Sequence, residues 1–104
     1  MPQSPDETPT LSLAIPCFNE EDVLDAFIER IRLVVNPLEI SYEMVFVNDG
    51  SSDGTLDRLL RFQKEDPRIL VIDLSRNFGK EAALTAAIEH ASGKAVIPID
   101  ADLQ

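Results

Sequence analysis

Short apolar runs alternate with longer amphipathic segments along almost the whole chain, and this alternation limits the possible folds more than any other feature. Four short runs are predominantly apolar, as buried strands are: residues 11–15, 44–47, 69–72 and 95–99. Between them, apolar residues recur at three- and four-residue steps, the spacing of one face of a helix. The resulting pattern, βαβαβαβ, predicts an α/β fold in which helices cover both faces of a parallel sheet.

The same sequence also predicts where the helices begin and end. The first helix is expected to run from an N-cap at Asn19 to Asn36-Pro37, because asparagine caps helices and proline ends them. The second stops near Asp66-Pro67, and the third closes at Ser92-Gly93. Pro98 lacks a backbone N–H, so it predicts a strand end or an irregularity in the last strand.

Composition excludes several classes of protein. The chain has 104 residues, enough for one domain, and its net charge of −10 argues against nucleic acid as a partner. No apolar run is long enough to span a membrane, no secretory signal is visible, and Cys17 cannot form an internal disulfide. Residues 1–10 carry three prolines without apolar periodicity and are expected to be a flexible lead to the fold at 11–104.

Polar and acidic residues follow three of the four predicted strands. In parallel sheets, ligands bind beyond the carboxyl ends of the strands, near a switch in strand order. Clustered carboxylates repel one another unless a cation or a hydrogen-bond donor joins them, and Asp100 and Asp102 are spaced to share Mg²⁺ or Mn²⁺. The three segments are residues 16–20 (PCFNE), 48–54 (NDGSSDG) and 100–104 (DADLQ).

Several of these residues have simpler structural interpretations. Asp53 is explained equally well as a cap of the second helix, and Glu20 as an acid that stabilises the first turn of a helix. Cys17 is better explained as an incidental small residue than as a nucleophile, since no histidine lies near it in sequence. Arg76 and Lys80 are either helix-start residues or donors to a diphosphate, and the second interpretation is slightly favoured.

The motifs together resemble those of a known family. Residues 15–21 (IPCFNEE), 47–55 (VNDGSSDGT) and 100–102 (DAD) resemble the inverting glycosyltransferases of family 2, which have the GT-A fold. Residues 74–84 (LSRNFGKEAAL) and 100–104 (DADLQ) resemble the polyprenyl-phosphate enzymes of that family, the bacterial bactoprenol (undecaprenyl-phosphate) glucosyltransferases and the dolichol-phosphate mannose synthases. The resemblance implies the N-terminal half of a Rossmann-like, GT-A nucleotide-sugar-binding domain over 11–104.

The resemblance also implies roles for individual residues. Asp100, Asp102 and Gln104 would hold a divalent metal, Mg²⁺ or Mn²⁺, that bridges the diphosphate of the donor. The residues that would contact the nucleotide-sugar are Pro16, Cys17, Phe18, Asn19, Glu20, Asn48, Asp49, Asp53, Arg76, Lys80 and Asp100.

The implied reaction is transfer of a hexose, glucose by resemblance, from a UDP-sugar to a polyprenyl phosphate with inversion. Family members continue past the metal motif, so the catalytic residue, the acceptor side and a membrane anchor are expected beyond Gln104. We therefore expect these 104 residues to lack turnover alone, and the full-length protein to work at the cytoplasmic face of the bacterial inner membrane. A sheet that stops after four strands would expose an edge, which predicts a tendency to form homo-oligomers.

Two alternatives remain at this point. One is a family 2 transferase with a polysaccharide or another acceptor, against which the strings NFGKEAAL and DADLQ weigh. The other is a non-catalytic, receiver-like module that binds metal or nucleotide and is phosphorylated at Asp73, near the end of the third predicted strand. In that scheme the pair Asp100 and Asp102 has no role.

Overall fold

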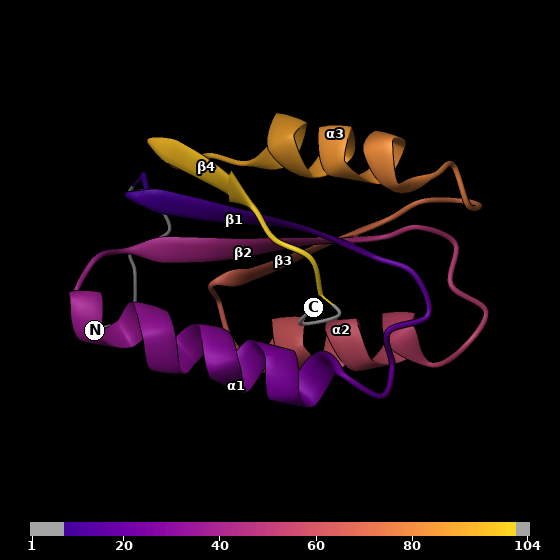
Figure 1. Ribbon diagram of the computed structural model, residues 1–104, viewed down its shortest axis with the longest axis horizontal. Coiled ribbons are helices and arrows are strands. Elements are labelled where there is room, and N and C mark those ends of the chain that lie inside the picture. Colours follow the sequence, from indigo (N-terminus) through magenta and orange to yellow (C-terminus); the bar gives the residue numbers. More distant parts are fainter. Residues whose placement is uncertain (1–7, 102–104) are drawn as a thin grey trace.

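A computed structural model describes residues 8–101, and within them four parallel strands form one sheet (Figure 1). The strands are β1 (Leu11–Cys17), β2 (Tyr42–Asn48), β3 (Ile69–Asp73) and β4 (Ala95–Pro98). They alternate with α1 (Leu24–Val35), a 3₁₀ turn η1 (Asn36–Leu38), α2 (Thr55–Glu65) and α3 (Lys80–His90). The predicted α/β fold with a parallel sheet is confirmed. Most of the predicted lead at 1–10, together with Asp102 and Gln104, lies outside the described residues.

The strand order is β3-β2-β1-β4, so the chain builds the sheet outward in one direction and then returns to the other side of β1. This order places a topological switch point between β1 and β4, where parallel sheets bind ligands. It also separates the protein from the receiver-like alternative, in which the third strand lies inside the sheet. Here β3, which carries Asp73, is an edge strand.

The two faces of the sheet are covered by different helices, with α1 and α2 on one face and α3 on the other (Figure 1). Side chains of neighbouring strand residues point to opposite faces. Ile15 and Phe46 belong to the larger core cluster with α1, whereas Ala14, Val45 and Val47 belong to the smaller one with α3. Because α3 contributes the buried alanines Ala83 and Ala87, it can lie close against the sheet.

The first helix begins later than predicted. It starts at Leu24, and Asn19 is not its N-cap, because Asn19 adopts a positive φ of 53°. The Asn19 side chain instead accepts a hydrogen bond from the backbone N–H of Ser52, at 2.8 Å. A contact between two loops therefore replaces the local capping bond. The predicted end of the helix before Asn36-Pro37 is confirmed.

Two prolines lie in the sheet where they remove no ladder hydrogen bond. Pro98 is the last residue of the edge strand β4, which confirms the strand end predicted from its lack of a backbone N–H. The N–H of Ile99 bonds to Ala14 of β1, so the nitrogen of the preceding Pro98 faces the outer edge. Pro16 of β1 lies beyond Ala14, the last residue of β1 that pairs with β4.

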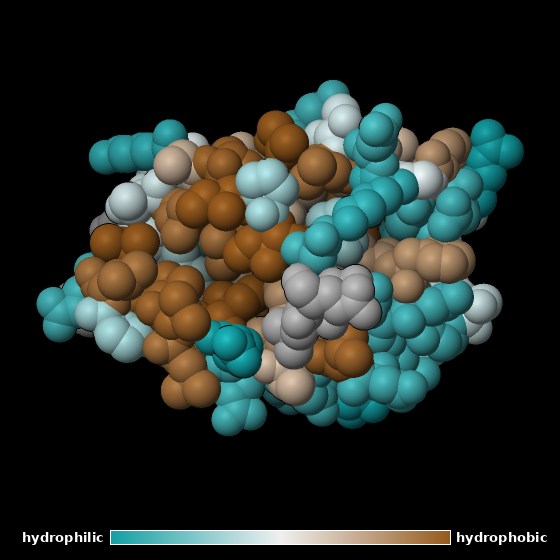
Figure 2. Space-filling model, viewed as in Figure 1, coloured by the Kyte–Doolittle hydropathy of each residue, from teal (hydrophilic) through white to brown (hydrophobic). Residues whose placement is uncertain are grey.

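Apolar side chains gather on one face of the molecule, between α1 and the edge strand β4 (Figure 2). Val34 is 62% exposed and Ile97 is 46% exposed. Formation of homo-oligomers through such a surface stays a prediction. None of the helices within residues 8–101 combines the length and the apolar character that crossing a membrane requires. The groove between α1 and β4 is lined by Leu11, Leu13, Phe27, Arg30, Ile31, Val34, Val35, Leu38, Ile97 and Ile99.

A small polar network ties the turn before β4 to the centre of the sheet. The carboxylate of Glu43 on β2 accepts hydrogen bonds from the hydroxyl of Ser12 at 2.5 Å and from the backbone N–H of Ser92 at 2.7 Å. The Ser12 oxygen in turn accepts the N–H of Gly93 at 2.8 Å. Since Ser12 is fully buried, Glu43 supplies an acceptor that water cannot replace. The network therefore holds the start of the strand that leads to Asp100.

Replacing Glu43 with alanine is expected to lower the free energy of unfolding by about 2 kcal/mol, because a buried donor loses its acceptor. Urea denaturation followed by circular dichroism measures this loss. Glu43→Gln keeps an acceptor oxygen and should lower the free energy of unfolding clearly less than Glu43→Ala does. Equal losses for the two variants would show that the hydrogen bonds contribute little.

Candidate functional site

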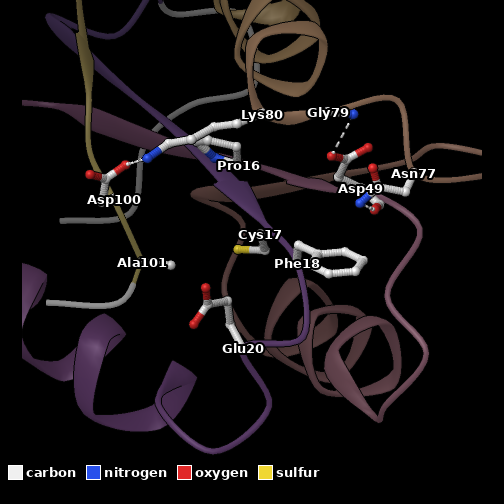
Figure 3. Close-up of a pocket in the computed structure, with 10 residues that line it drawn as sticks. All are labelled: Pro16, Cys17, Phe18, Glu20, Asp49, Asn77, Gly79, Lys80, Asp100 and Ala101. Carbon is white, nitrogen blue, oxygen red and sulfur yellow. Dashed lines mark hydrogen bonds and ion pairs between the residues drawn. The ribbon is translucent and has the colours of Figure 1, made fainter. Parts of the chain in front are cut away.

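A cavity of about 230 Å³ opens at the switch point between β1 and β4 (Figure 3). The loops after β1, β2 and β4 and the start of α3 each contribute to its wall, so four separate segments of the chain meet there. The lining residues are Pro16, Cys17, Phe18, Glu20, Asp49, Asn77, Gly79, Lys80, Asp100 and Ala101.

The carboxylate of Asp49 joins the end of β2 to the start of α3. It is 3% exposed, and its two oxygens accept the backbone N–H groups of Phe78 at 2.8 Å and Gly79 at 3.1 Å. The Asn77 side chain also donates to the backbone oxygen of Asp49, at 3.2 Å (Figure 3). A buried carboxylate is stable only when hydrogen bonds or charges compensate its lost hydration. These bonds therefore hold the turn at Asn77–Gly79 against the cavity.

An ion pair crosses the cavity between α3 and the end of β4. The ammonium nitrogen of Lys80 lies 2.6 Å from Oδ1 of Asp100 (Figure 3). The two side chains are 66% and 52% exposed, so both remain in contact with water. A carboxylate of this kind offers the hard oxygen ligand that Mg²⁺ and Mn²⁺ prefer.

The last residue of β1 contributes a thiol to the cavity, and the loop after it contributes an aromatic ring and a carboxylate. Phe18 is 46% exposed, unusual for a large apolar side chain, whereas Cys17 is buried. Burial raises the pKa of the Cys17 thiol far above its ordinary range, and the charge of Glu20 raises it further. The sulfur therefore stays protonated, in agreement with the prediction that Cys17 is not a nucleophile. The carboxylate of Glu20 points toward the space between Cys17 and Ala101 (Figure 3).

The loops after β1 and β2 are clamped to each other beside the cavity. Asp53 accepts the backbone N–H of Thr55 at 2.9 Å and that of Glu21 at 3.4 Å, and Glu21 accepts the N–H of Gly54 at 3.1 Å. Asn19 donates its backbone N–H to the hydroxyl of Ser51 at 2.9 Å. Asp53 is not the N-cap of α2 that the simpler interpretation predicted, because that position is Gly54. Asp53 lies one residue earlier, and its carboxylate accepts the N–H of Thr55, the first residue of the helix.

Two further predicted residues are engaged elsewhere. The Asn48 side chain donates to Asp73 at 2.9 Å, while its own oxygen is buried and has no hydrogen-bond partner within residues 8–101. The Arg76 guanidinium lies 4.7 Å from the centre of the Phe78 ring, a cation–π contact. Asn48, Asp53 and Arg76 line a second, polar depression at the ends of β2 and β3.

The structure therefore brings together most of the predicted site. Seven of the predicted residues line the cavity: Pro16, Cys17, Phe18, Glu20, Asp49, Lys80 and Asp100. Four do not, namely Asn19, Asn48, Asp53 and Arg76, while Asp102 and Gln104 lie outside the described residues. Sequence reasoning missed Asn77, Gly79 and Ala101. The turn NFG, between the basic residues Arg76 and Lys80, is a sequence pattern that could have indicated Asn77 and Gly79. Ala101 has no polar or charged group that could have indicated it.

A divalent metal was predicted at Asp100, Asp102 and Gln104. Within the described residues 8–101, no three histidine, cysteine or acidic side chains are grouped closely enough to hold a metal ion. Asp100 nevertheless fits the role of a ligand, because its exposed carboxylate already holds a positive charge, the ammonium of Lys80.

A sheet of this order, with a polar cavity at its switch point, defines an α/β protein of the nucleotide-binding class. The family model for glycosyl transferase family 2 matches residues 12–104. The chain belongs to this family, and its architecture is the Rossmann-like fold of the GT-A glycosyltransferases.

Curated relatives agree with this assignment. An uncharacterized glycosyltransferase of Synechocystis sp. is 53% identical over 94 residues, which are 90% of this chain and 30% of the relative. A bactoprenol glucosyl transferase of Shigella phage SfV is 45% identical over 94 residues, with the same shares of the two chains. The chain thus spans about 30% of the length of the curated relatives that it matches.

Solved structures show the same fold. The mannosyltransferase PcManGT from Pyrobaculum calidifontis, in complex with GDP-Man and Mn²⁺, has a TM-score of 0.79 at 28% identity, over 94% of this chain and 29% of that one. TarS residues 1–349 of S. aureus, in complex with UDP, has a TM-score of 0.75 at 24% identity, over 89% and 27% of the two chains.

Gly50 permits the close approach on which the Asp49 contact depends, and its substitution tests that contact. A Cβ at Gly50 would overlap the backbone nitrogen of Asn77 and lie 2.5 Å from the carbonyl carbon of Arg76, at a φ of +69°. Gly50→Ala is expected to lower the free energy of unfolding by about 3 kcal/mol, from backbone strain and overlap together. Urea denaturation measures the loss.

Gly50→Asn is the matched control for this prediction. Asparagine adopts a positive φ more readily than alanine does, but it places the same Cβ against the backbone of Asn77. The control variant is therefore expected to lose nearly as much as Gly50→Ala, about 2–3 kcal/mol. A loss for Gly50→Asn that was close to zero would contradict the close packing of the two loops.

The hydrogen bonds to Asp53 predict a dependence of stability on pH. Desolvation raises the pKa of Asp53, but the bonds from Thr55 and Glu21 outweigh it and hold the pKa below the ordinary 3.8. The carboxylate therefore stabilises the fold above pH 3.8, and this contribution is lost as pH falls through the lower pKa of the folded state. Asp53→Ala is expected to cost about 1 kcal/mol at pH 7, with the difference from wild type shrinking below pH 3.8.

Urea denaturation between pH 7 and about pH 2.5 measures this dependence. Glu89→Ala, which removes an exposed acid from the last turn of α3, controls for the loss of one negative charge. A difference between wild type and Asp53→Ala that stayed constant over this range would show that ionised Asp53 is not what stabilises the loop.

Proposed function

We propose that this chain is the nucleotide-sugar-binding part of a glycosyltransferase that moves glucose from a UDP-sugar to a polyprenyl phosphate, with inversion. The observation that carries the proposal is the cavity at the switch point, where Phe18, Lys80 and Asp100 converge from three segments. The relatives named bactoprenol glucosyl transferase, at 43–45% identity, support glucose and a polyprenyl carrier over other donors and acceptors.

Four side chains that line the cavity have distinct roles in the proposed binding of the donor. The exposed ring of Phe18 offers a face on which the base can stack. Asp49 holds the turn at Asn77–Gly79, and Glu20 presents a carboxylate that can accept hydroxyl hydrogens of the ribose or the sugar. Lys80, at the start of α3, can donate to the diphosphate, since a helix N-terminus also favours negative charge.

The donor diphosphate carries negative charge into a protein whose own net charge is −10. A bound Mg²⁺ or Mn²⁺ supplies neutralisation of the charge that develops on the leaving diphosphate. Within residues 8–101, Asp100 would be its ligand, and we propose Asp102 and Gln104 as the others. The whole protein would then work where its lipid acceptor is, at the cytoplasmic face of the membrane.

Donor binding tests the part of this proposal that these residues carry. Isothermal titration calorimetry of the chain with Mn²⁺ should show binding of UDP-glucose in preference to GDP-mannose, and chelation of the metal should weaken it. Phe18→Ala is expected to weaken UDP binding about tenfold, because stacking on a base contributes about 1–3 kcal/mol. Leu33→Ala, an exposed apolar residue on α1 away from the cavity, should bind as the wild type does. Preference for GDP-mannose, or no binding of UDP-glucose, would contradict the proposed donor.

A further inference from the structure

The ion pair between Lys80 and Asp100 involves the carboxylate that is also the proposed metal ligand. Oδ1 of Asp100 faces the Lys80 ammonium at 2.6 Å, and the same carboxylate is the proposed metal ligand (Figure 3). A divalent cation bound at this carboxylate would stand within a few ångströms of the ammonium and be repelled by it. The lysine and the metal therefore compete for the carboxylate.

The backbone position of Lys80 is unfavourable for a positive charge. Lys80 is the first residue of α3, where the helix dipole already places partial positive charge. A lysine at this end gains from a nearby anion, and Asp100 supplies one. A local conflict of this kind, compensated by a contact to a distant segment, is typical of functional positions.

The main chain just before Lys80 is held, whereas its side chain has room to move. Both N–H groups before it, those of Phe78 and Gly79, bond to the buried carboxylate of Asp49. The Lys80 side chain itself is 66% exposed and has four rotatable carbon–carbon bonds. Its ammonium can therefore change partners within the cavity while α3 stays in place.

We propose that Lys80 is a counter-ion built into the cavity. It neutralises Asp100 when no divalent cation is bound, and it moves its ammonium to the diphosphate when the cation and the nucleotide bind. This inference rests on the proposed function for the identity of the anion that receives the ammonium. The competition for Asp100 rests on the ion pair and on the proposed ligation of the metal by Asp100, and it needs no nucleotide.

Removing the Lys80 charge should consequently have opposite effects on two affinities. Lys80→Met frees Asp100 and is expected to tighten binding of Mn²⁺ alone about fivefold, which corresponds to about 1 kcal/mol. The same variant loses a donor to the diphosphate and is expected to weaken UDP binding at saturating Mn²⁺ about tenfold. A purely structural role of Lys80 would not move the two affinities in opposite directions.

The experiment titrates Mn²⁺ into the chain without nucleotide, following the electron paramagnetic resonance signal of the free ion, and then titrates UDP by calorimetry. Lys80→Arg keeps the charge and should bind Mn²⁺ as the wild type does. Lys94→Met controls for net charge. It removes one positive charge just before β4 begins, whereas Asp100 lies after the opposite end of that strand. Circular dichroism confirms that each variant is folded.

The possible outcomes separate this inference from the proposed function. Tighter Mn²⁺ binding by Lys80→Met, but not by Lys94→Met, supports the counter-ion. Unchanged, weaker or absent Mn²⁺ binding by Lys80→Met overturns it, even if UDP binding falls. Failure of the wild type to bind UDP in the presence of Mn²⁺ contradicts the proposed function instead, because the Mn²⁺ titration contains no nucleotide.

Discussion

The candidate site depends on one buried carboxylate, that of Asp49. Its two oxygens accept backbone N–H groups from the turn before α3, and these bonds replace the water that burial removes. Gly50 beside it has no side chain, so the backbone of Arg76 and Asn77 can approach closely. The start of α3, and with it Lys80, is thereby held at the end of β2. Without this contact, the wall of the cavity and the ion pair to Asp100 would lack a common support.

Strand order explains why the remaining groups meet at that point. Since β4 returns to the far side of β1, the loops after these two strands diverge and leave space between them. Glu43 and Ser12 hold the turn that begins β4, at the opposite end of the sheet from the cavity. The acidic side chains at the cavity are compensated in different ways: Asp49 by backbone N–H groups and Asp100 by Lys80. For the proposed anionic donor, a chain of net charge −10 would need a cation that accompanies the ligand.

Much of the fold could be predicted from the sequence because its signals are local. Short apolar runs and helical periodicity depend on neighbouring residues alone, and so do the helix ends at Asn36-Pro37 and Asp66-Pro67. The start of α1 was predicted wrongly, because Asn19 carries the local signal of an N-cap yet bonds to Ser52 in another loop. Asp53 and Asn48 show the same ambiguity, since a polar residue after a strand suits a cap, a loop contact or a ligand equally well.

By itself, the sequence determined the parallel α/β architecture, the family and the strand ends around which a ligand site would form. The tertiary structure decided which polar residues of those loops face the cavity. Phe18, Asp49 and Lys80 line it, while Asn19 and Asp53 hold the loops together beside it, through Ser51 and the N–H of Glu21 respectively. It also decided that Asp100 is paired with Lys80. The physical reason is that these contacts join segments about 20–35 residues apart in the chain, and local sequence preferences carry no information about such pairs.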